Sequence, residues 1–194
     1  VLLPSFIQYL NTYYSGTGLG AAYLSGSRAI ADLVSTVLKP IVSVYRSAEY
    51  LGESTVTDAL KPYITNFADA MVITVINKGG ITNKYTDSGT GATNINIYGL
   101  LLVALAIKTG MDTTGKYQTC YNTIITLLTN TSTIFRYTPT LVDSQPVTTS
   151  LSRSRWFNYD MDLTAEYLIM TDMLGIAPAF NNVTYGLHGL CGDG

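Results

Sequence analysis

The sequence predicts a mainly α-helical protein, folded as a single-domain bundle of about six helices. Apolar residues recur at intervals of three and four along most of residues 1–129, and this spacing places side chains on one face of an α-helix. Glycines and prolines stand where these periodic segments stop, as they do at helix ends. A chain of 194 residues can bury one hydrophobic core. We expect helices over 1–129, an irregular segment over 130–158, and a last helix with a tail over 159–194.

The first helix is short and is followed by glycines. Pro4 and the apolar residues up to Leu10 are typical of a helix with proline in its first turn. The glycine-rich stretches at 16–20 and 89–92 have the composition of phosphate-binding loops. Neither follows a predicted strand or carries the Lys-Ser/Thr pair of such a loop. We interpret both as flexible connectors.

A long helix is predicted over residues 30–51, where a narrow apolar stripe ends at Leu51. Pro40 lies inside the stripe and has no backbone N–H, so we expect a kink or a break at Lys39. Gly52 is expected to end this helix.

The next helix carries apolar residues on one side from Leu60 to Val75, with Thr55 or Thr57 as its N-cap. The β-branched run 72–76 also suits a buried strand, but its continuity with the periodic residues favours helix. The segment 79–93, with four glycines, is predicted to be an exposed loop or a short hairpin without burial of its own, at an edge or an interface.

An antiparallel helical hairpin is predicted over residues 94–128. Its first helix ends at the turn Thr109-Gly110, and Thr113 or Thr114 caps its second helix. This hairpin resembles the helical pairs of α/α-toroid carbohydrate enzymes, and residues 156–175 are loosely similar to them. The resemblance implies a carbohydrate-active enzyme or a fragment of one, and it assigns no catalytic residue.

The helical pattern stops over residues 130–158, which are rich in Thr, Ser and Pro. Short β-strands are an alternative at 134–137 and 146–149. Asn158 or Asp160 then caps the last helix, which ends at Gly175.

The composition indicates a neutral surface. Charged residues make up 12% of the chain and the net charge is -2, so the clustered Lys and Arg of a nucleic-acid-binding protein are absent from the sequence. Surface polarity must come from Thr, Ser, Asn and Tyr, and such a surface is easily buried against another copy of the chain. No apolar run reaches the roughly 20 residues of a membrane span.

Catalytic candidates are few. A single histidine, His188, and two distant cysteines make a metal or cofactor site improbable, and we expect none. Asp160, Asp162 and Glu166 lie near Trp156 and would be the acids of a glycoside hydrolase if the chain were an enzyme. Acids in a first helical turn also stabilise the helix dipole, and we favour that interpretation.

Several features suggest an extracellular protein. The chain begins at Val1, from which we expect either that an N-terminal segment has been removed or that the chain is a fragment, and we favour the first. Cys120 and Cys191 suit one disulfide, with two unpaired thiols as the alternative. Asn130 and Asn182 each begin a glycosylation sequon, and we expect both in loops.

Together these features predict a secreted, non-enzymatic structural protein that assembles with copies of itself into an extracellular filament, sheath or virion shell. The expected interface residues are Tyr13, Tyr14, Tyr185 and Leu187, with the 79–93 loop. The alternatives are the carbohydrate-active enzyme and a glycan-binding or adhesion module, for which glycans would be the partner.

Overall fold

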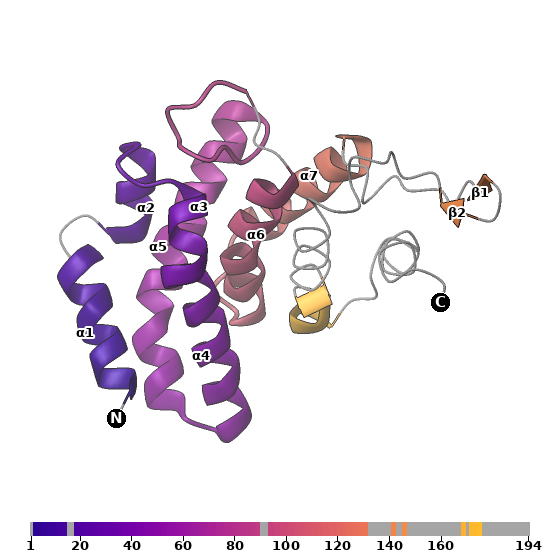
Figure 1. Cartoon of the computed structure of the whole chain (residues 1–194). Coiled ribbons are helices and arrows are strands. Elements are labelled where there is room, and N and C mark those ends of the chain that lie inside the picture. The colour runs from indigo at the N-terminus through magenta and orange to yellow at the C-terminus, as the bar shows by residue number, and fades with distance from the viewer. Residues whose placement is uncertain are drawn as a thin grey trace. The chain divides into compact units, whose positions relative to one another are not determined.

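A computed structural model of the chain describes residues 2–14, 18–89, 93–131, 141–142, 145–146, 168–169 and 171–175. These residues are mainly helical, which confirms the predicted fold class (Figure 1). The chain divides into two compact units, residues 1–124 and 125–194. The single domain and its subdivision at 129 and 158 stay predictions.

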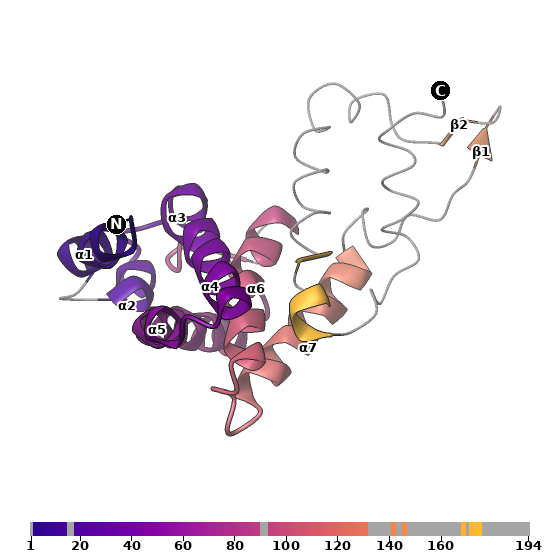
Figure 2. The ribbon, with the colours of Figure 1, turned by 90° about the horizontal axis from the view of Figure 1, so that it is seen from below.

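The first unit is a bundle of helices around α5. It contains α1 (Leu2–Tyr14), α2 (Gly18–Leu24), α3 (Ile30–Leu33), the π-helical turn η1 (Val34–Leu38), α4 (Lys39–Leu51), α5 (Ser54–Lys78), α6 (Thr93–Lys108) and the start of α7 (Lys116–Thr131). Helix α5 packs against α1, α2, α4 and α6. Figures 1 and 2 both show α5 between α1 and α2 on one side and α6 on the other.

In the second unit the described residues are fewer. Strands β1 (Leu141–Val142) and β2 (Gln145–Pro146) pair in antiparallel fashion inside the predicted irregular segment. Residues 168–169 and 171–174 are helical, within the predicted last helix.

Helix α6 forms the centre of the hydrophobic core. Every residue from 95 to 106 is buried, and those from Leu100 to Ala106 are completely shielded from solvent. A helix that is apolar on all sides is stable only when other elements surround it. The sequence of α6 therefore requires the central position that the structure gives it.

The long helix predicted over 30–51 is interrupted, as expected from Pro40. The N–H of Lys39 bonds to the carbonyl of Val34, five residues back, which closes the π-turn η1. Helix α4 then begins at Lys39 directly after η1, with Pro40, which has no N–H to donate, in its first turn. Gly52 ends α4 in the left-handed conformation, with φ of 73°, as predicted.

Two predicted caps are wrong. Helix α5 begins at Ser54 after Glu53, without a side-chain cap, so neither Thr55 nor Thr57 serves as the N-cap. At α7 the cap is Asp112 rather than Thr113 or Thr114. Its Oδ1 accepts from the N–H of Tyr117 at 3.0 Å and its Oδ2 from that of Gln118 at 2.8 Å. A carboxylate accepts both bonds with a full charge, which a threonine hydroxyl cannot match.

The glycines at 16–20 are not only a connector, because α2 begins at Gly18. Gly20 lets α2 approach α5 closely: its N–H donates to Oδ1 of Asn66 at 2.7 Å. A Cβ at position 20 would lie 2.3 Å from the backbone oxygen of Asn66. Position 20 therefore requires glycine, because a side chain there would push α2 away from α5.

The 79–93 loop is also partly buried, contrary to the expectation. Ile81 and Thr82 are shielded from solvent, and Thr82 accepts a hydrogen bond from the hydroxyl of Tyr23 through its backbone oxygen at 2.9 Å. The backbone oxygen of Asn83 accepts from the N–H of Ile30 at 2.8 Å. These bonds fasten the first part of the loop to α2 and α3.

Candidate functional site

The turn between α4 and α5 exposes two large apolar side chains. Tyr50 is 91% exposed and Leu51 is 70% exposed, and both lie in the last turn of α4. The N–H of Gly52 bonds to the carbonyls of Ala48 and Glu49, which fixes the end of the helix. The turn thus holds a tyrosine and a leucine in solvent on an ordered backbone, an arrangement suited to contact with another molecule.

A second apolar pair lies near the other end of α5. Ile73 is 41% exposed and Ile76 is 76% exposed. Residues three positions apart share one face of a helix. This face of α5 therefore presents isoleucine to solvent.

Together, Tyr50, Leu51, Ile73 and Ile76 are here called the exposed apolar set. Tyr50 and Leu51 lie in the last turn of α4, just before α5 begins, and Ile73 and Ile76 lie near the far end of that 25-residue helix, so they form two separate contact points.

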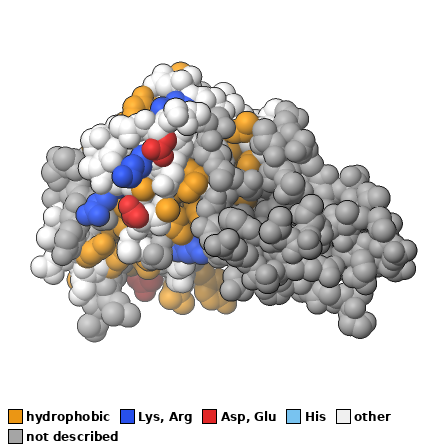
Figure 3. Space-filling model, turned by 45° about the horizontal axis from the view of Figure 1, so that its top comes forward, with side chains coloured by type: hydrophobic (Ala, Val, Ile, Leu, Met, Phe, Trp, Pro, Cys, Tyr) orange, Lys and Arg blue, Asp and Glu red, His pale blue; other side chains and the backbone are white. Residues whose placement is uncertain are grey.

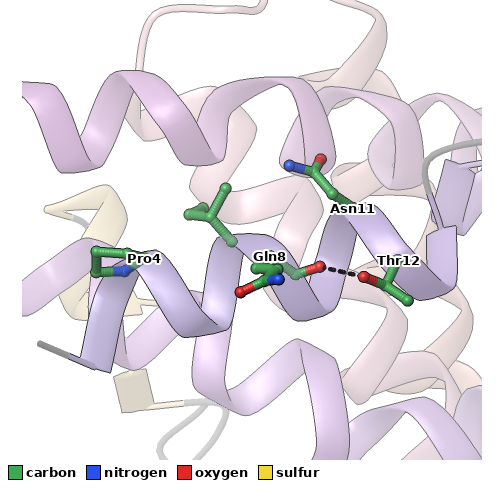
Figure 4. A pocket seen from close by; sticks show the side chains of 5 residues that line it. Pro4, Gln8, Asn11 and Thr12 are labelled. Atoms are coloured by element: carbon green, nitrogen blue, oxygen red, sulfur yellow. Dashed lines mark hydrogen bonds between the residues drawn. The ribbon is translucent and has the colours of Figure 1, made fainter.

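A shallow hollow lies along α1 (Figure 4). Its lining combines an apolar part with amide and hydroxyl groups: Pro4, Ile7, Gln8, Asn11 and Thr12. The hydroxyl of Thr12 donates to the backbone oxygen of Gln8 at 2.8 Å. These side chains carry no ionisable group, so the hollow offers no general acid or base.

Some of the charged groups of the described residues form ion pairs on the surface of the helices. Lys61 lies 2.7 Å from Asp58 within α5, and Lys116 lies 2.6 Å from Asp69. Asp69 also accepts a hydrogen bond from the hydroxyl of Tyr117. Groups of three or more potential metal ligands do not occur among the residues that the structure describes.

On the coloured part of the face drawn in Figure 3, Lys, Arg, Asp and Glu side chains lie between polar and apolar atoms. This distribution follows from the 12% charged content of the sequence. A surface of this kind repels a second copy only weakly.

The structure describes few of the predicted site residues. Tyr13 and Tyr14 lie in the last turn of α1, and Asn130 lies in the last turn of α7 rather than in a loop. Cys120 is buried on α7, and burial raises the pKa of its thiol to about 12. The remaining candidates lie outside the described residues: Asp160, Asp162, Glu166, Asn182, Tyr185, Leu187 and Cys191. The disulfide, the glycans and the catalytic alternative therefore stay predictions.

The exposed apolar set was missed in the sequence, although part of it left a signal. Ile73 and Ile76 fall outside the apolar side of α5 that runs from Leu60 to Val75, so their exposure follows from helical periodicity. Leu51 was assigned to a buried stripe, and its exposure shows that assignment to be wrong.

Comparisons with known proteins give no relative. No protein-family model matches the sequence, and no curated protein or solved structure shows a significant match. None of the helices in the described ranges combines the length and apolarity needed to cross a bilayer.

Proposed function

We propose that the chain is a non-enzymatic structural protein that assembles with copies of itself into an extracellular filament, sheath or virion shell. The observation that carries this proposal is the exposure of Tyr50 and Leu51 at the turn between α4 and α5. Tyrosine is enriched at protein interfaces because it brings a large apolar area together with one hydroxyl group.

Burial of this turn against a neighbour would favour association. A leucine that passes from full exposure to full burial contributes about 1.5–3 kcal/mol. In a polymer the same contact recurs at every subunit, so a modest free energy per contact is multiplied along the assembly. Ile73 and Ile76 supply a second apolar contact, and two separate contacts on one subunit are what a polymer requires.

The proposed location is the cell surface or a virion, with the Cys120–Cys191 disulfide and glycans at Asn130 and Asn182 as parts of the same proposal. These modifications suit an oxidising compartment. The low charge of the surface supports close approach of identical copies.

The proposal is tested by assembly of the purified chain, followed by light scattering and negative-stain electron microscopy. A variant with Tyr50→Gln and Leu51→Gln, here called the turn variant, removes the two exposed apolar side chains at the end of α4 and keeps residues that favour a helix. Its matched control carries Ser43→Gln and Ser47→Gln, at two exposed positions of the same helix. The wild type and the control should assemble, and the turn variant should remain monomeric with unchanged helicity.

Two outcomes would overturn the proposal. A wild-type chain that stays a uniform monomer of 21.0 kDa at every concentration tested would exclude self-assembly. Hydrolysis of a glycan that is lost in Asp160→Asn, Asp162→Asn or Glu166→Gln would show an enzyme instead.

A further inference from the structure

Helix α1 is held at the edge of the first unit by few buried groups. Of its described side chains, Leu10 is completely shielded from solvent, whereas Phe6, Ile7 and Tyr9 are half-buried. The hydroxyl of Tyr63 on α5 donates a hydrogen bond to Oδ1 of Asn11. Figures 1 and 2 both show α1 on the outside of the bundle.

Helix α2, which follows directly, is fixed much more firmly. Leu19 and Tyr23 are shielded from solvent, and the Gly20 N–H bonds to Asn66. Three residues, 15–17, separate the end of α1 from Gly18 at the start of α2. A loosely attached helix therefore joins a firmly packed one through a very short connection.

A connection of only three residues favours exchange of the attached element between copies, because short hinge segments between packed elements promote domain swapping. The acceptor surface needs no new complementarity, since α1 already packs on α2 and α5 in its own chain. Exchange of an identical element is a low-cost route to oligomers.

We propose that α1 is exchanged between copies of the chain, so that α1 of one copy packs on α2 and α5 of the next. This inference rests on the proposed self-assembly and names the element that links the subunits. Each copy donates one helix and accepts one helix, so the exchange either closes reciprocally between two copies or continues head-to-tail into a ring or an open polymer.

The test uses cysteine cross-linking in mixed assemblies. One preparation carries Asn11→Cys on α1 and the other carries Tyr63→Cys on α5, at the two positions joined by a hydrogen bond. The two are unfolded, mixed, refolded and assembled, then treated with a short bis-maleimide. A covalent dimer that joins the two variants, identified by peptide mass spectrometry, is the expected result.

Two controls make the result specific. A chain with both substitutions should give the cross-link within one chain when it is monomeric, which shows that the reagent spans the pair. A mixture of Thr123→Cys and Tyr63→Cys chains tests chance encounters, because position 123 is exposed on α7 and away from the Tyr50–Leu51 turn in the sequence, and it should give no dimer.

A further variant lengthens the connection between α1 and α2 and leaves the residues of both helices unchanged. Insertion of several Gly-Ser pairs after Gly16 relieves the short connection, so α1 can close onto its own chain. The exchanged form should then be lost, together with the interchain cross-link in the same mixed assay.

The outcomes separate the two proposals. Assemblies that form without the interchain cross-link overturn the exchange of α1 and leave self-assembly standing. Failure of the wild-type chain to assemble at all overturns the proposed function.

Discussion

The hydroxyl of Tyr117 donates a 2.6 Å hydrogen bond to Oδ1 of Asp69, and so joins the first turn of α7 to α5. The ammonium group of Lys116 lies 2.6 Å from the same oxygen and 4.9 Å from the centre of the Tyr117 ring. One carboxylate therefore holds two neighbouring residues of α7. This group of contacts stabilises the fold rather than forming a site, because its donors and acceptor are already paired.

Loss of the Tyr117 hydroxyl should weaken the fold and change its response to base. Burial and the neighbouring Asp69 carboxylate raise the pKa of Tyr117 above its ordinary value of 10.0. The folded state then keeps this proton more tightly than the unfolded state, so the contribution is complete below pH 10 and is lost as pH rises through the folded pKa. We expect Tyr117→Phe to lower the free energy of unfolding at pH 7 by about 1 kcal/mol.

The same variant should also show a shallower loss of stability above pH 10, measured by urea denaturation at several pH values. Tyr50→Phe is the control, because the Tyr50 side chain is exposed. An equally steep loss above pH 10 in wild type and Tyr117→Phe would contradict this account.

Removal of the Asp112 cap should destabilise α7. Asp112→Ala leaves the N–H groups of Tyr117 and Gln118 without their carboxylate acceptor, at an expected cost of about 1 kcal/mol in the free energy of unfolding. Thr113→Ala and Thr114→Ala, at exposed neighbouring positions, should leave it unchanged. Equal effects of the three substitutions in thermal or chemical unfolding would argue against the cap.

A side chain at position 20 should force α2 away from α5. In Gly20→Ala the new Cβ would meet the backbone oxygen of Asn66 at 2.3 Å, and overpacking of this kind costs about 1–3 kcal/mol. Gly52→Ala is the comparison, because its Cβ meets nothing within 4 Å and only its φ of 73° is strained. Gly20→Ala should be the more destabilising of the two, and the reverse order would contradict close helix packing.

The thiol of Cys120 should react only when the fold opens. It is 4% exposed, and burial raises its pKa to about 12 from an ordinary value of 9.0. Thiolate is the reactive form, so in a Cys191→Ser chain maleimide labelling should be slow in buffer and immediate in concentrated urea. Labelling at the same rate in both conditions would show that Cys120 is accessible.

Periodicity in the sequence predicts the helices of the first unit well. Apolar spacing locates α4, α5, α6 and α7, and Gly52 marks the end of α4 as expected. These features depend on residues close together in the chain. The burial of Thr82 against Tyr23 depends on a partner 59 residues away, and for that reason local composition classified its loop as exposed.

The candidate site was less predictable for a related reason. Tyr50 and Leu51 lie in the last turn of α4. Their exposure depends on which elements distant in the sequence cover that turn, and a local pattern of apolar residues does not contain this information. The other predicted contact residues remain predictions, because their side chains lie outside the described residues.

The π-turn before Pro40 has a consequence for the surface far from it. A π-turn holds one residue more than an α-turn, which advances the rest of the helix by one position, or roughly 100° of rotation. After η1 the buried positions are Ile41, Val42, Tyr45 and Ala48, whereas the predicted stripe runs through Ile41, Val44, Ala48 and Leu51. The buried face after η1 therefore includes Val42 and Tyr45 in place of Val44, and Leu51 lies outside it at the end of α4.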